Sequence, residues 1–172
     1  MHSSTILAAI AGFAAATHAQ IFSVRPLSID QRLTPPSIQI NFTVSAPGTS
    51  VYNGGPAPAQ CNLTLPGRGV GTCWNKCGPS TGSQYYARVT PSSFKSTSNY
   101  SLDIWQSYVY ELGNHNNATV PISTTDACIE YTCTKKTNDN VCQTGKHSEG
   151  FNATYTAYYG GADPPQDQLC IV

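Results

Sequence analysis

Apolar and polar residues alternate along several short stretches of the chain, and this period of two constrains the fold more than any other feature. In residues 37–45, SIQINFTVS, the apolar side chains of Ile38, Ile40, Phe42 and Val44 are separated by polar ones. Successive side chains of a β-strand point to opposite faces, so such a stretch is typical of a strand with one buried face. The same alternation recurs in residues 60–66, 99–104, 117–122 and 151–159.

Each of these stretches carries an Asn-x-Ser/Thr sequon whose middle residue is apolar. The sequon asparagines are Asn41, Asn62, Asn99, Asn117 and Asn152, and the middle residues are Phe42, Leu63, Tyr100, Ala118 and Ala153. On a strand, the asparagine and its hydroxyl partner would face water while the middle residue faces the core. We therefore expect all five asparagines to be exposed glycosylation sites.

The rest of the chain favours an all-β fold. Outside the N-terminus, no stretch shows a sustained apolar period of 3.6, and clusters of Gly and Pro separate the alternating segments. We predict a single antiparallel β-barrel or sandwich of roughly eight strands, stabilised by disulfides. Weaker strands are expected at 21–25, 84–90, 104–111 and 128–134, an edge strand at Pro121 because proline cannot donate to a ladder, and a short helical turn near 139–146.

The N-terminal 19 residues resemble a secretory signal. An apolar run from Thr5 to Ala16 is too short to span a bilayer, and Thr17-His18-Ala19 has the small-x-small form of a cleavage site. We expect residues 1–19 to be a signal peptide and residues 20–172 to be one secreted, extracellular domain with no membrane span.

Composition argues against a nucleic-acid partner. The formal net charge is zero, charged residues make up 10% of the chain, and Lys135-Lys136 is the only basic doublet. Proteins that bind nucleic acid usually carry a basic stripe, and none is visible here. We expect no cofactor and no metal either.

Seven cysteines lie in the predicted mature domain: Cys61, Cys73, Cys77, Cys128, Cys133, Cys142 and Cys170. The stretch Cys73-Trp74-Asn75-Lys76-Cys77 has one residue too many for a C-x-x-C redox motif, and no second ligand pair at zinc-finger spacing exists. In an oxidising compartment the cysteines should mostly form structural disulfides. Because their number is odd, one is free or bonds to another chain.

A small secreted hydrolase is the enzyme alternative, with a ribonuclease ahead of a glycosidase. A ribonuclease would need histidines as acid and base, a carboxylate and an arginine. The candidates are His115, His147, Glu149, Arg68 and Arg88, whose spacing carries no signal. For a glycosidase pair the acids on or near strands are Asp103, Glu111 and Glu130. We expect no catalytic residue.

Tyrosine is abundant, with ten residues and doublets at Tyr85-Tyr86 and Tyr158-Tyr159. Single rings are expected to fill the core and its rim. Taken together, outward rings would form a binding patch. A cell-wall or glycan-binding module would show coplanar exposed rings, with Trp105 beside Tyr86 or Tyr158.

The order of these features resembles the fungal AA1-like domain family, the family of the major Alternaria allergen. The likeness covers roughly residues 36–160. It rests on the alternating strand that ends at Cys61, on Trp74-Asn75-Lys76-Cys77-Gly78, on the two following strands, and on the late cysteine pair that closes on Val141-Cys142-Gln143.

The resemblance implies a secreted, disulfide-bonded, non-catalytic β-barrel of effector or elicitor type. Its partner would be a host extracellular protein or a small phenolic or glycan ligand, and a homodimer is possible. The family's bridges would fall on Cys61–Cys77 and Cys128–Cys142, while Cys73, Cys133 and Cys170 are additions. Recognition would use loops without sequons, such as 66–82 and 134–148.

Overall fold

The computed structural model describes residues 20–46, 57–66, 71, 73–79, 82–108, 114–161 and 163–170. The predicted signal peptide lies outside these residues. Within them, the elements are β1 (Ile21–Leu33), β2 (Pro36–Ser45), β3 (Ala59–Pro66), β4 (Asn75–Lys76), β5 (Ser83–Val89), β6 (Asn99–Tyr108), β7 (Asn114–Ser123), β8 (Tyr131–Lys135), β9 (Asp139–Thr144), β10 (Phe151–Thr154), β11 (Thr156–Tyr159) and the 3-10 helix η1 (Gln166–Gln168). No helical segment among the described residues is long and apolar enough to cross a membrane.

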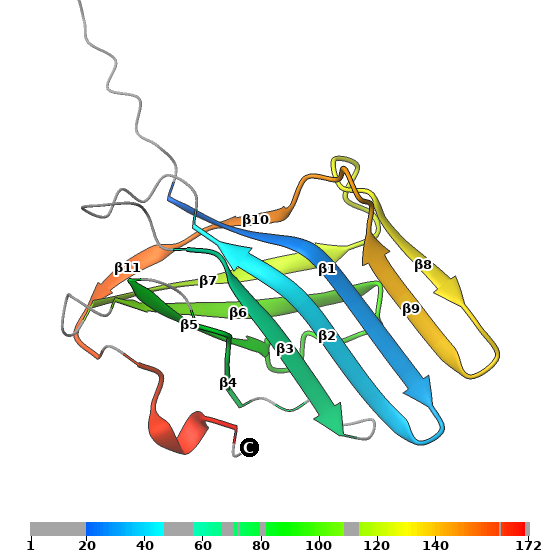
Figure 1. Cartoon of the computed structure of the whole chain (residues 1–172), viewed down its shortest axis with the longest axis horizontal. Coiled ribbons are helices and arrows are strands. Elements are labelled where there is room, and N and C mark those ends of the chain that lie inside the picture. The colour runs from blue at the N-terminus through cyan, green and yellow to red at the C-terminus, as the bar shows by residue number, and fades with distance from the viewer. Residues whose placement is uncertain are drawn as a thin grey trace, which may run out of the picture.

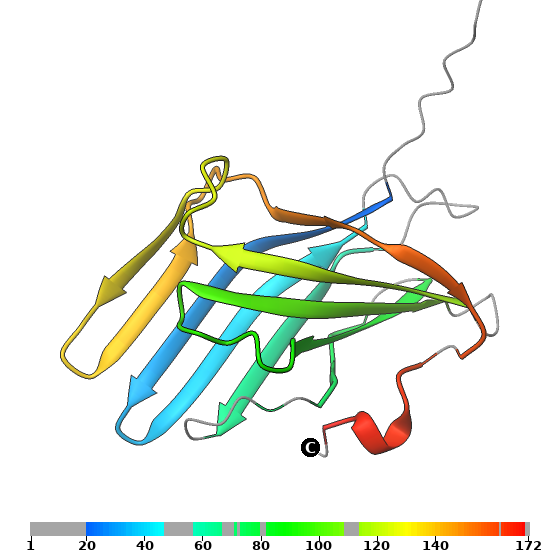
Figure 2. The ribbon, with the colours of Figure 1, turned by 180° about the vertical axis from the view of Figure 1, so that it is seen from behind.

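The strands form two antiparallel sheets that face each other (Figure 1). The first sheet has the order β3-β2-β1-β9-β8, with β10 paired to the start of β1, and the second has the order β11-β7-β6-β5-β4. Figure 2 shows the second sheet lying across the first. The all-β antiparallel prediction is confirmed, and of its two forms the sandwich is the one observed, because the sheets do not close into a barrel.

The period-two pattern builds the core as expected. The apolar phase of β2 is buried at Ile38, Ile40, Phe42 and Val44, and these residues pack between the sheets. From the second sheet, Tyr100, Leu102 and Ile104 of β6 and Val120 and Ile122 of β7 are buried in the same core. Buried apolar area is the main driving force for such packing, at roughly 25 cal/mol per Å².

The sequon stretches have the predicted orientation. Asn41, Asn62, Asn99 and Asn152 are exposed, whereas Asn117 is partly buried. Their middle residues turn inward: Phe42, Leu63 and Tyr100 are buried, and Ala118 and Ala153 pack against the core.

The segment 151–159 joins the two sheets at one corner of the sandwich. β10 pairs with Ile21–Val24 of β1 in the first sheet, and β11 pairs with the start of β7 in the second. Between them, Tyr155 is buried and its backbone N–H donates to the carbonyl oxygen of Gln20 at 3.0 Å. The chain thus changes sheet within one residue.

Three disulfides hold the sandwich together. Cys61–Cys77 links an inward residue of β3 to the residue that follows β4, and so ties the two sheets at one edge, as the family resemblance implied. Cys73–Cys170 fastens the C-terminal segment beside β4.

The third disulfide differs from the expected pairing. Cys142 bonds to Cys133, which lies directly opposite it in the β8–β9 ladder, so the predicted Cys128–Cys142 pairing is wrong. A disulfide needs Cα atoms within about 7 Å. Cys128 lies in the turn before β8 and is free and exposed.

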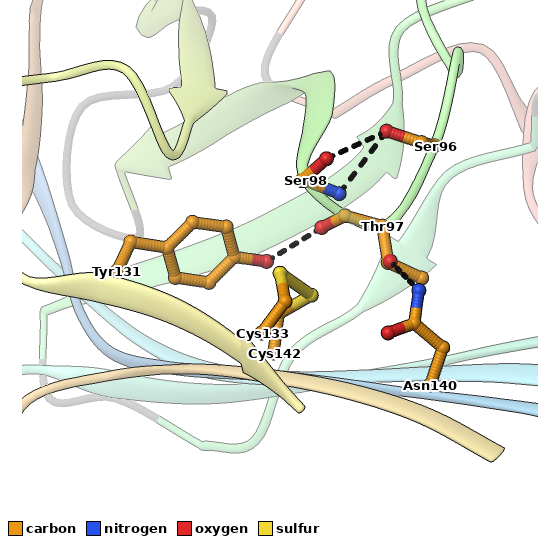
Figure 3. Close-up of a disulfide and its surroundings, with 7 residues drawn as sticks. All are labelled: Ser96, Thr97, Ser98, Tyr131, Cys133, Asn140 and Cys142. Carbon is orange, nitrogen blue, oxygen red and sulfur yellow. Dashed lines mark hydrogen bonds between the residues drawn. A yellow bond between two sulfur atoms is a disulfide. The ribbon is translucent and has the colours of Figure 1, made fainter. Parts of the chain in front are cut away.

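The β8–β9 hairpin is fastened to the second sheet beside this disulfide. Figure 3 shows the Tyr131 hydroxyl donating to the Thr97 carbonyl at 2.8 Å, while the Asn140 amide donates to the Thr97 hydroxyl. Thr97 lies between β5 and β6 and is buried. Tyr131 and Asn140 therefore connect the two sheets through polar contacts at the end opposite β11.

Several sequence predictions about elements are wrong. The turn expected near 139–146 is strand β9, which pairs with both β1 and β8. The expected loop 134–148 consequently contains a strand, and only part of 66–82 lies among the described residues. The edge position expected for Pro121 is observed. β11 pairs only with residues 114–117 of β7, so Pro121 has a ladder partner in β6 alone.

Candidate functional site

Three aromatic rings form a stack on the outer face of the second sheet. The rings of Trp105 and His115 lie 3.9 Å apart at 10°, and those of His115 and Tyr158 lie 5.1 Å apart at 12°. The strands set this order, because β7 lies between β6 and β11 and Tyr158 is directly opposite His115. We call Trp105, His115 and Tyr158 the ring stack.

The ring stack differs from the platform expected of a glycan-binding module. Its rings are parallel but lie face to face, so the flat faces between them are covered by each other. Tyr86 does not extend it into a platform. Tyr86 is buried, and its hydroxyl is hydrogen-bonded to Asp163 of the C-terminal segment. Burial and the Asp163 carboxylate together raise the pKa of Tyr86 to about 12. The coplanar arrangement of Trp105 with Tyr86 or Tyr158 is not formed.

A pocket of about 130 Å³ opens beside the ring stack, at the corner where the chain changes sheet. Its walls come from the residue before β1, the end of β6, the start of β7, the β10–β11 junction and β11. We call it the tyrosine mouth, lined by Gln20, Tyr108, Asn114, His115, Asn116, Tyr155, Ala157, Tyr158 and Tyr159. Tyr158 is 44% exposed and Tyr159 88% exposed, so two rings at its rim face solvent.

A buried hydrogen-bond network lies behind the tyrosine mouth. The Asn116 amide donates to the Gln106 side-chain oxygen at 3.1 Å and to the Tyr108 hydroxyl at 2.7 Å. The Gln106 amide in turn donates to the Ser83 hydroxyl and the Tyr85 hydroxyl, both at 3.1 Å. Buried polar groups held in such a network are fixed in orientation. The inner wall of the mouth is therefore polar and rigid.

The mouth is electrically neutral at neutral pH. Burial raises the pKa of Tyr155 to about 12, with the hydrogen-bonded Tyr108 adding to the shift, and burial also raises the pKa of Tyr85. Burial lowers the pKa of His115, an effect that a hydrogen bond with the Gly161 backbone partly offsets. The lining thus offers hydroxyls, amides and aromatic rings without a net charge.

A second pocket, of about 340 Å³, lies on the side of Trp105 opposite the tyrosine mouth. Trp74 meets Trp105 edge to face at 5.7 Å, and the Arg88 guanidinium lies 4.3 Å from the Trp74 ring centre. Arg88 also bonds to Asp103 at 3.0 Å. The C-terminal segment, held by Cys73–Cys170 and by the bridge between Trp74 and Leu169, contributes Pro165 and Gln168 to the wall.

The structure does not assemble the proposed ribonuclease residues. His115 lines the tyrosine mouth, whereas exposed His147 lines a different pocket with Arg25 and Lys146. Arg88 is paired with Asp103, Glu149 is exposed, and Arg68 lies outside the described residues.

The candidate glycosidase acids are not brought together either. Asp103 accepts hydrogen bonds from the Thr90 and Thr119 hydroxyls, at 2.7 and 2.8 Å, in addition to its bond with Arg88. Glu130 is exposed beside the first sheet, and Glu111 lies outside the described residues. The described part of the chain contains no cluster of three His, Cys, Asp or Glu side chains that could hold a metal ion.

Sequence reasoning singled out Trp105, His115 and Tyr158 separately and missed the network. A signal for it exists, because Gln106 falls in the inward phase of β6 between Ile104 and Tyr108, and Asn116 falls in the inward phase of β7. Two polar residues in the buried phase of adjacent strands indicate a polar region of the core.

The chain matches no protein-family model, and comparisons with curated proteins and with solved structures found no match.

Proposed function

We propose that the protein is a secreted, non-catalytic recognition protein of effector or elicitor type, which binds an extracellular host protein through the tyrosine mouth. The observation that carries this proposal is the juxtaposition of two exposed tyrosines, Tyr158 and Tyr159, with a pocket whose polar wall is already fixed. Both parts are needed, because exposed rings supply contact area and the pocket supplies specificity.

The chemistry of the mouth suits protein recognition. Tyrosine provides a large rigid contact area with a polar tip at low cost in side-chain entropy, and it is enriched in binding surfaces together with Asn and Ser. The mouth combines four tyrosines with Asn114 and Asn116. An aromatic or polar side chain of the partner would enter the pocket, and Tyr158 and Tyr159 would be covered around it.

Pocket size favours a protein over a small phenolic or glycan ligand. About 130 Å³ accommodates a single ring. A ligand of that size would leave Tyr159, at 88% exposure, outside the contact. Neither the hydrolase nor the glycan-platform alternative gains support, since the histidines lie in separate pockets and the rings are stacked face to face.

The disulfides support the extracellular setting of the proposal. Three bridges in one domain are typical of proteins that fold in an oxidising compartment. They also limit opening of the two sheets, so the mouth keeps its shape in a harsh extracellular fluid.

The test is a quantitative capture experiment with three baits. Wild type, Tyr158→Ala/Tyr159→Ala and Leu33→Ala are immobilised at equal density and exposed to host extracellular fluid, which for a plant host is apoplastic fluid. Leu33 is the matched control because it is 52% exposed and lies at the distant end of β1.

We expect one host protein to be retained by wild type and Leu33→Ala and to be depleted at least tenfold on the double variant, a loss typical of removing binding hot spots. Equal retention on all three baits would contradict the proposal. Recovery of the chain itself would instead indicate a homodimer, and saturation of wild type by a small phenolic compound would indicate the smaller ligand.

A further inference from the structure

One sequon asparagine lies in the wall of the Trp74–Trp105 pocket. Asn117, Ala118 and Thr119, the complete sequon, all line this pocket of about 340 Å³. Asn117 is directly opposite Trp105 in the β6–β7 ladder, where Cβ atoms of paired residues are about 4.5–5.5 Å apart.

Asn117 differs from the other four sequon asparagines in its surroundings. It is the one that is only partly exposed, and Asn41, Asn62, Asn99 and Asn152 all face open solvent. Asn41 and Asn62 also line a pocket, of about 210 Å³, but the aromatic residue there, Phe42, turns its ring into the core. Only at Asn117 does a sequon share a described pocket with indole rings.

The chemistry of the pocket matches that of an N-acetylhexosamine. One face of the Trp105 ring packs against His115. Trp74 contacts Trp105 edge to face, so the two indoles form a corner of the pocket. A pyranose ring has an apolar face of C–H groups that gains free energy when an aromatic ring covers it. The carboxylate of Asp103 and the amide of Gln168 provide polar partners on the walls.

We propose that Asn117 carries an N-linked glycan whose first N-acetylglucosamine folds back into this pocket and packs against Trp105. Attachment forms a bond from the Asn117 amide nitrogen to C1 of the sugar while the bond from C1 to a lipid pyrophosphate carrier breaks. The displaced amide proton leaves with the pyrophosphate, so no oxidant is required. The inference rests on secretion, as in the proposed function, but not on the tyrosine mouth. The sugar would become part of the outer layer, between the second sheet and the C-terminal segment.

The proposed position of the first sugar predicts that its removal and the removal of the later sugars have different consequences. Only the sugar nearest the asparagine reaches the pocket, so later sugars extend into solvent. Trp74 is 5% exposed without any sugar, whereas Trp105 is only partly buried. Removing the whole glycan would therefore uncover Trp105 to water, whereas trimming to one sugar would not.

The test uses protein secreted from a eukaryotic host, with glycopeptide mass spectrometry to measure occupancy. Wild type is compared with Asn117→Gln and with the control Asn152→Gln, whose asparagine is exposed on β10. A second series treats wild type with an endoglycosidase that leaves one N-acetylglucosamine, or with an amidase that removes the entire glycan. The readouts are the thermal midpoint and the tryptophan emission maximum.

We expect Asn117 to be occupied, and Asn117→Gln to lower the thermal midpoint by about 3 °C, the shift typical of a modest loss in a domain of this size. Tryptophan emission should move to longer wavelength in that variant and after complete deglycosylation, but not after trimming or in Asn152→Gln. If Asn117→Gln fails to be secreted, the enzymatic series on wild type decides alone.

Two results would overturn the proposal: an empty Asn117 in molecules whose other sequons are occupied, or identical behaviour of complete and partial deglycosylation. Host-protein capture is measured on the same samples. If wild type captures no host protein, the result counts only against recognition through the tyrosine mouth. If Asn117 carries no glycan, the result counts only against the proposed glycan site.

Discussion

At the scale of single residues, Gln106 and Asn116 determine the character of the tyrosine mouth. Their exposed fractions are 0% and 2%, and their amides connect Ser83, Tyr85 and Tyr108 across three strands. Burying such groups is unfavourable unless every donor and acceptor is paired, so the network fixes the tyrosine hydroxyls in one arrangement.

Truncating the centre of this network should be costly. Asn116→Ala leaves the Gln106 side-chain oxygen without the donor it has at 3.1 Å, and we expect the free energy of unfolding to fall by about 2 kcal/mol. Urea unfolding followed by circular dichroism measures this loss. The control Gln39→Ala, on the exposed face of β2, should change stability by less than about 0.5 kcal/mol. Equal effects of the two substitutions would contradict the network.

His115 should make folding sensitive to mild acid. Burial lowers its pKa below the ordinary 6.5, so the unfolded chain binds the proton more readily than the folded chain. The stability contributed by neutral His115 is therefore complete above pH 6.5 and is lost as the pH falls from 6.5 toward the folded pKa.

The measurement is the free energy of unfolding between pH 7.5 and pH 5, together with NMR titration of the histidines. His115→Gln should flatten the decline over this window, and His147→Gln, at an exposed position, should leave it unchanged. A folded-state pKa for His115 at or above 6.5 would refute this explanation.

At the scale of elements, the sequence predicted best those strands whose inward phase is continuously apolar. The stretch 37–45 corresponds closely to β2, because Ile38, Ile40, Phe42 and Val44 have no other way to share one buried face. The prediction from sequence failed for β9, because Asn138, Asp139 and Asn140 resemble a turn. The conformation of β9 is decided by its pairing with β1 and β8. Such pairing is non-local and leaves no periodic signal in a six-residue strand.

The disulfides should differ in their contribution to stability. Cys73–Cys170 spans 97 residues and Cys133–Cys142 spans 9, so loop-closure entropy predicts losses of about 4–5 and about 2–3 kcal/mol on replacing each pair by serine. Urea unfolding of the two double-serine variants compares them directly. A larger loss for the Cys133–Cys142 variant would show that the hairpin, with its contacts to Thr97, matters more than chain entropy.

At the scale of the whole molecule, the proposed function depends on bringing distant segments to one corner. The tyrosine mouth combines Gln20, the neighbouring strand ends at Tyr108 and Asn116, and Tyr155, so three separate parts of the chain meet there. The expected strands included Tyr108 and Tyr155 but not Gln20 or Asn116. Alternation also could not predict that segment 151–159 passes from one sheet to the other. The ring stack was unpredictable for the same reason, since its order depends on which strands are neighbours.

The complete cysteine pairing is a direct check on this topology. Non-reducing peptide mapping of the protein should recover Cys61 with Cys77, Cys73 with Cys170 and Cys133 with Cys142. Cys128 should react with an alkylating reagent before reduction, because it is exposed and unpaired. A peptide joining Cys128 to Cys142 would require a different register for β8 and β9.

The most direct test of the central claim is to map where the captured host protein lies on the sandwich. Hydrogen–deuterium exchange of the free and bound protein should show new protection at residues 114–116 and in segment 155–159, which contribute most of the lining of the tyrosine mouth, and none at residues 37–41 of β2. Protection confined to β2 or to the β8–β9 hairpin, with unchanged exchange at 155–159, would contradict recognition through the tyrosine mouth.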